Sequence, residues 1–214
     1  MDIQEAIVAL PALMTAVILH EYAHGWMAYK MGDPTAKEFG RLTLNPIPHI
    51  DPLGTLLLPG ILMVAGSPIL FGWAKPVPIN PSMFRNLRLG TFLVSIAGIT
   101  MNILLAVLFA FLYRLIVQGY FNFLSDAVLV PLALFLGQGV LINLVLAFFN
   151  AIPIPPLDGS RALMSLFSIR YWELFYRFEM YGFLIITLLL FTGILGSIIF
   201  PPIRFLWNYL MGRL

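Results

Sequence analysis

The sequence predicts an all-α polytopic membrane protein, on the strength of its composition, its long apolar runs and the placement of its charges. Hydrophobic residues make up 60% of the chain and charged residues only 10%, with a mean hydropathy of +0.93. Soluble domains carry about 25% charged residues, so a water-soluble fold could not cover this much apolar surface. The 214 residues are expected to form one membrane-embedded domain, residues 1–214, with roughly four to six spans of about 20 apolar residues each.

The first expected span runs from Ile3 to Tyr29 and carries three ionisable residues in its second half. Asp2 and Glu5 stand where a cleavable signal peptide has basic residues, so this span is expected to remain in the mature protein. A polar segment, residues 30–51, follows it and ends in a turn-rich stretch with closely spaced prolines, residues 45–52.

The next apolar stretch, Leu53–Trp73, is interrupted by glycines and prolines. These breaks favour a re-entrant excursion that enters the membrane and returns, sheltered by protein or water. The alternative is a complete span with a kink. The segment from Ala74 to Pro81 has further prolines at positions 76 and 78, which forbid a helix and favour extended backbone.

Two long uninterrupted spans come next, at Gly90–Val117 and Ala127–Phe149. The second runs into a proline-rich loop that leads to Asp158. Ser160–Phe178 mixes arginines with aromatic residues, as expected of a helix at the membrane interface. Tyr181–Phe200 is the last clean apolar span.

The basic residues predict the orientation, because cytoplasmic loops are enriched in Lys and Arg. Nine of the twelve basic residues fall in three groups: Lys30, Lys37, Arg41, Lys75, Arg85, Arg88, Arg161, Arg170 and Arg177. All nine lie on one face of a multi-pass protein of the cell membrane if the N-terminus is outside and Leu53–Trp73 does not cross completely. His24 and Asp158 then lie toward the cytoplasmic side. The net charge of +2 is too small to indicate a nucleic-acid partner.

The first span contains His20, Glu21 and His24 in the pattern H-E-x-x-H. Residues four apart share one face of a helix, so the two imidazoles can bind one metal ion. Glu21 lies about 100° further round the helix, where it can act as general base on water acidified by zinc. The alternative is two structural histidines beside a solvated glutamate. An ionisable side chain inside a span costs roughly 2.5–3.5 kcal/mol, so three together indicate a function.

Two histidines leave a zinc site one protein ligand short, and in a chain without cysteine Asp158 is the best candidate. It follows three prolines that break a helix near the membrane, where the freed backbone groups need a polar cavity. His20, His24 and Asp158 would leave one zinc position open, as catalytic sites do. The alternative is that Asp158 caps a helix starting at Ser160. Asp33 and the other loop carboxylates are expected to be solvated charges.

Asn102 ends a stretch of small residues that begins at Ser95. Small residues let helices approach closely, and the Asn102 amide is expected to face the site and stabilise an oxyanion. His49, in a proline-rich turn, is expected to be a loop residue or to support a ligand rather than to bind metal. Asn143 and Asn150 are expected to form helix-to-helix hydrogen bonds.

With these motifs in place, the chain resembles the site-2 protease family of intramembrane zinc metalloproteases, in its compact prokaryotic subgroup. The stretch His20–His24 matches the zinc motif of the family. Leu157–Gly159, with the prolines before it, matches the second motif, whose aspartate is the third zinc ligand in the family. Ser95–Asn102 is similar to a third segment, although Ile99 stands where proline is common.

The resemblance implies a three-helix metalloprotease core with one Zn²⁺ ion per chain, plus an extra helix and the re-entrant, extended proline-rich segment. The core helices are the spans that begin near Ile3, Gly90 and Ala127. The implied activity is hydrolysis of a peptide bond in or near the transmembrane segment of a membrane-anchored protein or peptide, within the lipid bilayer. A membrane metal transporter and an inactive membrane chaperone on a protease fold are the alternatives. The sequence makes no prediction of the oligomeric state.

Overall fold

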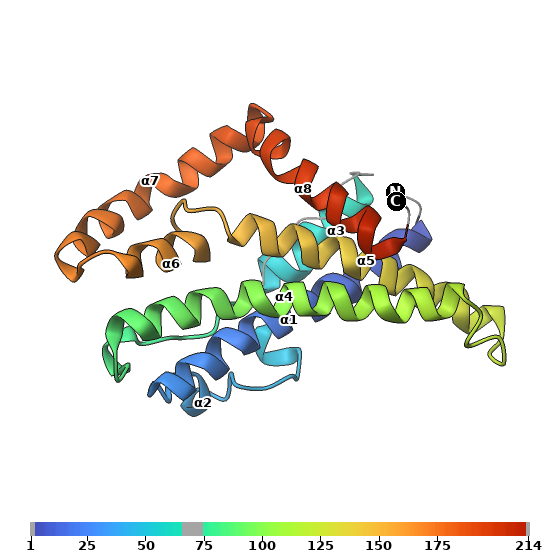
Figure 1. Cartoon of the computed structure of the whole chain (residues 1–214), viewed down its shortest axis with the longest axis horizontal. Helices are drawn as coiled ribbons and strands as arrows, with labels where there is room; N and C mark the ends of the chain where they lie inside the picture. Colours follow the sequence, from blue (N-terminus) through green and yellow to red (C-terminus); the bar gives the residue numbers. More distant parts are fainter. Residues whose placement is uncertain (1–2, 66–74, 213–214) are drawn as a thin grey trace.

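The computed structural model describes residues 3–65 and 75–212, and every regular element within them is a helix (Figure 1). The long helices are α1 (Ile3–Met31), α4 (Leu87–Val117), α5 (Asp126–Asn150), α7 (Trp172–Phe191) and α8 (Ile194–Met211). The short ones are α2 (Thr35–Glu38), a π-helical turn (Pro52–Leu57), α3 (Leu58–Val64), α6 (Asp158–Leu166) and 3-10 turns at Ile47–His49, Pro81–Met83 and Ile169–Tyr171. Four helices, α1, α4, α5 and α8, are long and apolar enough to cross a membrane. The predicted all-α polytopic fold is therefore confirmed.

Helices α1, α4 and α5 pack against one another at the centre of the molecule. Figure 1 shows that α1 and α4 run in opposite directions and that α5 runs back alongside α4. The predicted three-helix core is present, although α4 begins three residues earlier than expected, at Leu87. It begins there because the Asn86 side chain accepts the Leu89 N–H (3.0 Å), which satisfies a free amide of the first turn.

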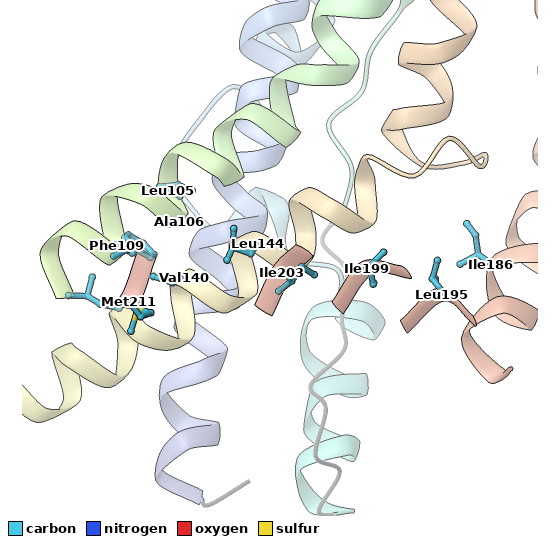
Figure 2. Close-up of a cluster of buried hydrophobic side chains, with 12 residues drawn as sticks. Leu105, Ala106, Phe109, Val140, Leu144, Ile186, Leu195, Ile199, Ile203 and Met211 are labelled. Atoms are coloured by element: carbon cyan, nitrogen blue, oxygen red, sulfur yellow. The ribbon is translucent and has the colours of Figure 1, made fainter. Parts of the chain in front are cut away.

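A layer of buried apolar side chains holds α4, α5 and α8 together (Figure 2). Its members include Leu105 and Phe109 of α4, Val140 and Leu144 of α5, and Ile203 of α8. Helices α4 and α5 come so close at Gly139 that a Cβ atom there would stand 2.4 Å from the Phe109 ring. Outward-facing side chains such as Leu104 and Phe111 are more than half exposed, as suits helices that lipid surrounds.

The last expected span, Tyr181–Phe200, is not one helix, because the chain turns between α7 and α8. Figure 1 shows these two helices meeting at an angle. The break falls at Gly193, whose φ of +74° is the left-handed conformation that glycine adopts most easily. Helix α8 then returns to the central bundle, where Arg114 of α4 donates a hydrogen bond to the Tyr209 carbonyl (2.6 Å).

The expected interfacial helix Ser160–Phe178 is also divided. Helix α6 ends at Leu166 because Phe167 adopts extended backbone (ψ 164°), and a 3-10 turn leads on into α7. Arg88 of α4 donates hydrogen bonds to the carbonyls of Ser165 (3.1 Å) and Leu166 (2.8 Å) at the end of α6. These bonds satisfy the last carbonyls of α6 and fix this short helix to the central bundle.

The chain between α1 and α4 leaves the bundle and returns to the same end of it. The N–H of Arg85, just before α4, donates to the carbonyl of Met31 at the end of α1 (2.9 Å). The Lys75 N–H also donates to the His49 carbonyl (2.9 Å), so the described residues on the two sides of this stretch are neighbours, and the re-entrant interpretation stays a prediction. The π-helical turn and α3 belong to this stretch, and residues 66–74 lie outside the described residues.

Residues 75–80 are extended, as their prolines predict, and lie against α1. The Val77 N–H donates to the carboxylate of Glu21 (2.8 Å), and the Asn80 N–H donates to the carboxylate of Asp33 (2.6 Å). The extended segment is thus attached at two points to the helix that carries the H-E-x-x-H motif, or to the residues directly after it.

Candidate metal centre

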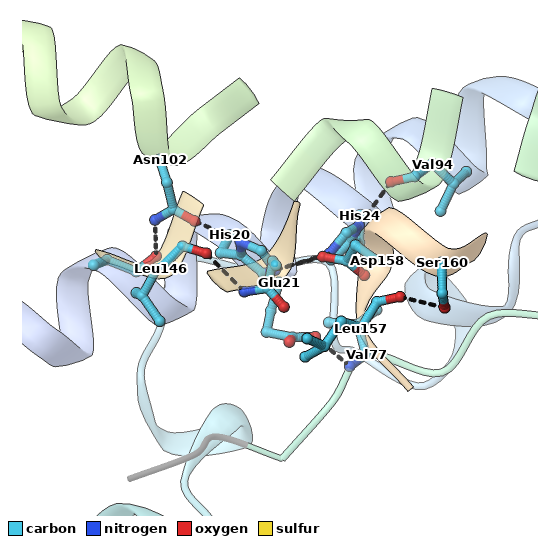
Figure 3. Close-up of polar contacts among 12 residues, drawn as sticks. His20, Glu21, His24, Val77, Val94, Asn102, Leu146, Leu157, Asp158 and Ser160 are labelled. Atoms are coloured by element: carbon cyan, nitrogen blue, oxygen red, sulfur yellow. Dashed lines mark hydrogen bonds and ion pairs between the residues drawn. The ribbon is translucent and has the colours of Figure 1, made fainter. Parts of the chain in front are cut away.

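His20 and His24 lie on one face of α1 and direct the same ring nitrogen to a common point. Their Nε2 atoms are 2.9 Å apart, and both side chains are buried. The rings meet edge to face, with 4.5 Å between their centroids. The four-residue spacing in the sequence therefore brings the two imidazoles together, as Figure 3 shows.

Asp158 reaches this point from α6, 134 residues further along the chain than His24. Its Oδ2 atom lies 3.2 Å from Nε2 of His20 and 3.1 Å from Nε2 of His24. Asp158 does not cap α6, because Leu157 holds the cap position without a side-chain hydrogen bond. Ligand atoms of the three residues all lie within 4.8 Å of one another, and the described part of the chain holds no second group of this kind.

The proline-rich loop before α6 places Asp158 close to the end of α5. A Cβ atom on Gly159 would stand 2.3 Å from the Ala151 carbonyl oxygen, so only glycine allows this close return of the chain. Burial alone would raise the pKa of the Asp158 carboxyl group, but the facing imidazoles of His24 and His20 outweigh burial and hold that pKa well below its usual value. Asp158 is therefore the carboxylate that a metal ligand must be.

The second nitrogen of each imidazole faces a hydrogen-bond acceptor. Nδ1 of His24 donates to the Val94 carbonyl (2.7 Å), and Nδ1 of His20 faces Oδ1 of Asn102 (2.5 Å), as Figure 3 shows. These oxygens only accept hydrogen bonds, so each Nδ1 carries a proton and a neutral ring has its lone pair on Nε2. With both rings neutral, two lone pairs and the carboxylate of Asp158 converge on one point, where a metal ion would bind; with a ring protonated, the extra proton lies between Nε2 and Asp158 instead.

The donor set fits zinc. Tetrahedral zinc with bonds of about 2.0–2.2 Å separates its ligand atoms by about 3.3–3.6 Å. The three ligand atoms stand 2.9–3.2 Å apart, so shifts of a few tenths of an ångström would accommodate the ion. Two imidazoles and one carboxylate also leave one position of a tetrahedral ion open, as in catalytic sites.

Glu21 lies outside the group of ligands, as a base rather than a ligand should. Its Oε2 atom accepts the Val77 N–H (2.8 Å), and Figure 3 shows its carboxylate on the side of the site where Val77 passes. The structure gives Oε1 no hydrogen-bond partner among the described residues. One oxygen of Glu21 is thus anchored, and no described residue bonds the other.

Asn102 is fully buried and makes contacts that the sequence did not predict. Its Nδ2 atom donates to the Ala16 carbonyl (3.3 Å) and to Oδ1 of Asn143 (2.7 Å), while its Oδ1 atom faces His20. Both amide hydrogens are therefore used between helices, and one of these bonds would have to break for Asn102 to bind an oxyanion. The contacts instead give Asn102 a part in orienting His20, and the oxyanion role stays a prediction.

Two further polar residues complete the surroundings of the site. His49 is buried in its loop, where Nε2 bonds the Thr43 carbonyl (2.9 Å), and it is not among the metal-ligand group. Asp33 was expected to be a solvated charge, but it is fully buried and holds the Asn80 N–H. The Asp-Pro-Thr sequence that starts at Asp33 is typical of a local turn bond, here to Thr35 N–H (3.0 Å), but nothing in it indicates a partner 47 residues away.

Comparison with known proteins gives consistent matches over most of the chain. The model of the family described as Peptidase family M50 matches residues 8–193. A protein of Bacillus subtilis (strain 168) named "Putative zinc metalloprotease YwhC" is 42% identical over 190 residues, which cover 89% of this chain and 82% of that protein. No solved structure matches the chain.

Two mycobacterial proteins, both named "Putative zinc metalloprotease Rip2", are also similar. The one from Mycolicibacterium smegmatis (strain ATCC 700084 / mc(2)155) is 30% identical over 203 residues, which cover 95% of this chain and 74% of that protein. The one from Mycobacterium tuberculosis (strain ATCC 25618 / H37Rv) is 34% identical over 157 residues, which cover 73% of this chain and 56% of that protein.

Proposed function

The chain belongs to peptidase family M50, the site-2 protease family, and is an intramembrane zinc metalloprotease; we propose that His20, His24 and Asp158 hold the zinc ion and that Glu21 is the general base. The observation that carries this assignment is the meeting of three ligand atoms from α1 and α6 within 4.8 Å of one another. Zinc in such a site supplies Lewis-acid chemistry, because it acidifies a water molecule and polarises a carbonyl group.

Glu21 accepts and then donates a proton in the proposed reaction. It takes a proton from the attacking water while the water oxygen bonds to the carbonyl carbon of the scissile peptide. It then delivers that proton to the leaving nitrogen as the C–N bond breaks. The Val77 N–H holds Oε2, so Oε1 is the oxygen that carries the proton.

The alternatives predicted from the sequence are not favoured. A transporter needs successive ligand sets along a path across the membrane, whereas the residues that the structure describes contain one such set. The family and the names of the relatives indicate peptide hydrolysis rather than metal transport. An inactive chaperone has no need of an intact base, and Glu21 is present and placed beside the ligands.

Substitution of Glu21 by glutamine tests the assignment in purified protein with a single-span reporter substrate. Glu21→Gln is expected to keep one zinc per chain and to lose at least about 100-fold in kcat, the lower end of what a general base contributes. His24→Ala and Asp158→Ala are expected to lose zinc. Glu38→Gln, the same change at an exposed position of α2, is the matched control and should leave both zinc and activity intact. Full activity of Glu21→Gln would remove the assignment.

The substrate of the proposed reaction is a membrane-anchored protein or peptide, because His20 and His24 sit on α1, a helix long and apolar enough to cross a membrane, and the short helix α6 brings Asp158 to them. A helical substrate must unwind locally before its carbonyl can react. The extended segment 75–80 is then positioned to pair with it as an added strand. Its prolines at 76 and 78 have no N–H, and the N–H groups of Val77 and Asn80 are already bonded, so the segment has mainly carbonyls to offer.

Backbone methylation of the substrate tests this pairing without altering the protease. Carbonyl acceptors on the enzyme require N–H donors on the substrate. N-methylation of single residues in a peptide substrate is therefore expected to lower kcat/KM at alternate positions, because successive N–H groups of a strand point to opposite sides. A uniform effect at every position would argue against strand addition.

The active-site end of the bundle faces the cytoplasm in this proposal. The nine basic residues that favour this orientation lie in the last turn of α1 or after it, before α4 or in its first turn, and after Asp158. Lys30 and Lys37 also lie over the rings of Trp26 and Tyr29, an arrangement that suits aromatic and basic side chains at the surface of a membrane.

A further inference from the structure

Two buried asparagines connect the metal centre to α5. Asn102 of α4 and Asn143 of α5 both have 0% of their surface exposed. Nδ2 of Asn102 donates to Oδ1 of Asn143 (2.7 Å), and Oδ1 of Asn102 faces Nδ1 of His20 (2.5 Å). Figure 3 shows the Asn102 amide directed at His20. The three side chains come from the three helices of the central bundle.

Two backbone carbonyls fix the direction of the amides. Nδ2 of Asn143 donates to the Gly139 carbonyl one turn earlier in α5 (2.8 Å). A carbonyl oxygen can only accept, so the Asn143 atom that faces it must be the NH₂ group, and Oδ1 of Asn143 must face Asn102. The Ala16 carbonyl of α1 also accepts from Nδ2 of Asn102 (3.3 Å). Both contacts require the NH₂ group of Asn102 to point away from His20.

The direction of the Asn102 amide decides the tautomer of His20. With Oδ1 facing the ring, Nδ1 of His20 carries the proton and the lone pair on Nε2 points to Asp158 and His24. With the amide reversed, the NH₂ group would donate to Nδ1. The proton of the neutral ring would then sit on Nε2, between the other two ligands, where it blocks a metal ion.

We propose that Asn143 is a positioning residue of the metal centre, which acts through Asn102 to hold His20 in its metal-binding tautomer. This proposal rests on the assignment of His20 as a zinc ligand. It assigns Asn143 a role in metal binding beyond the helix-to-helix hydrogen bond expected from the sequence.

The two histidines should differ in their dependence on Asn143. His24 donates its Nδ1 proton to the Val94 carbonyl, a backbone group that cannot reverse. His20 depends on a side-chain amide that can. Loss of Asn143 is therefore expected to disturb the tautomer of His20 and to leave that of His24 unchanged, a contrast that general damage to the fold would not produce.

The matched substitutions are Asn143→Leu and Asn143→Asp, which have nearly the size and shape of asparagine. Leucine removes the acceptor that faces Asn102, whereas a protonated aspartic acid keeps that acceptor and can donate its O–H to the Gly139 carbonyl. Asn143→Leu is expected to weaken zinc binding about 10–100-fold, as loss of a residue that orients a metal ligand does. Asn143→Asp should keep an affinity close to that of the unaltered protein. Zinc affinity is measured by competition with a chelator on the full chain in detergent.

Nitrogen NMR of histidine-labelled protein gives a second measurement that is independent of activity. The chain has three histidines, so ¹⁵N-histidine labelling reports on His20, His24 and His49 alone. In the metal-free protein, His20 is expected to show one tautomer, protonated at Nδ1. Asn143→Leu should give a mixture of tautomers at His20 and none at His24.

The double variant Asn102→Asp/Asn143→Leu separates the loss of amide orientation from general damage that Asn143→Leu does to the bundle. An aspartate at 102 presents an accepting oxygen in either orientation, so Asn143→Leu should no longer affect the His20 tautomer in that background. The proposal is wrong if Asn143→Leu leaves zinc affinity and the His20 spectrum unchanged, or if Asn143→Asp is as defective as Asn143→Leu. If the assignment of His20 as a zinc ligand were itself wrong, His20→Ala would retain zinc.

Discussion

At the scale of single residues, the metal centre depends on Gly98 having no side chain. A Cβ atom at this position of α4 would stand 2.5 Å from Cε1 of His20 and 2.5 Å from Nε2 of His24. Real Cβ atoms do not approach other atoms so closely, so any larger residue would push the imidazoles away from Asp158. The sequence suggested close helix packing at this glycine, whereas the structure shows that it makes room for the ligands.

Gly98→Ala is therefore expected to lower zinc affinity at least about tenfold, or ~1.4 kcal/mol. The matched control is Gly137→Ala in α5, where a Cβ atom would meet only Met211 and Tyr113 side-chain atoms at 3.8 Å. Alanine in a helix is more favourable than glycine by roughly 0.5–1 kcal/mol. The control should keep zinc and unfold at the same or a slightly higher temperature. Equal zinc affinity in the two variants would contradict this account of Gly98.

The meeting of the proposed ligands could be predicted in part from the sequence, because the spacing of the two histidines is local. His20 and His24 share a helix face by spacing alone, and Glu21 adjoins them. Asp158 could be selected by its position after a helix-breaking loop and by the resemblance of Leu157–Gly159 to the second motif of the family. The contacts of Asn102 could not be predicted, because they depend on Asn143 and on the Ala16 carbonyl, which pack beside it only in the folded bundle.

At the scale of elements, Asp33 and the extended segment 75–80 form one unit with α1. Asp33 accepts hydrogen bonds from the Asn80 N–H (2.6 Å) and the Thr35 N–H (3.0 Å), and it also accepts from the Thr35 hydroxyl. Asp33 thereby fixes the end of segment 75–80. The second contact of this segment is the hydrogen bond from the Val77 N–H to Glu21. The position of Glu21, the proposed general base, is thus coupled to Asp33, just after the end of α1.

Asp33→Ala is expected to disturb the position of Glu21, the proposed base, and to leave metal binding unchanged. It leaves the Asn80 N–H without its acceptor, which is expected to cost about 1–3 kcal/mol of stability. Misplacement of Val77 relative to Glu21 should lower kcat/KM by up to about 100-fold, while the zinc content stays at one per chain. Metal analysis with and without chelator treatment measures the zinc content. Thermal unfolding measures the stability, and reporter cleavage measures kcat/KM.

Asp126→Ala provides the comparison for Asp33→Ala, because Asp126 is exposed at the first turn of α5. Its loss should cost only the helix-end electrostatic contribution, about 0.3–1 kcal/mol. An Asp33→Ala protein with unchanged kinetics would show that the extended segment does not position the base.

The helices of the central bundle could be predicted from the length of their apolar runs. The breaks between the helices outside the bundle could not. Residues on both sides of Gly193 are apolar, and a glycine in such a run is compatible with a continuous span. The left-handed turn there is favoured by the return of α8 to the bundle, where Arg114 bonds the Tyr209 carbonyl. Contacts between distant parts of the chain therefore decided where α7 ended.

At the scale of the whole molecule, one end of the bundle gathers the metal ligands and most of the basic residues. The hydrogen bond from Arg85 to Met31 brings the end of α1 and the start of α4 to this end. Arg88 fixes α6, and with it Asp158, to the same place. The loop between α4 and α5 lies at the opposite end of α4 and has no Lys or Arg. By the positive-inside rule, this arrangement supports the proposed cytoplasmic position of the ligand end.

Single cysteines can test this orientation directly, because the chain has none of its own. Glu38→Cys lies at the ligand end and Asn122→Cys in the loop between α4 and α5, and both positions are exposed. In intact cells a membrane-impermeant maleimide is expected to label Asn122→Cys and to spare Glu38→Cys, because the basic residues beside Glu38 hold that end inside. After permeabilisation both should react. Labelling of Glu38→Cys from outside would show that the protein has the opposite orientation. The proposed zinc ligands would then lie at the outer face, and substrates would be cut from the other side of the membrane.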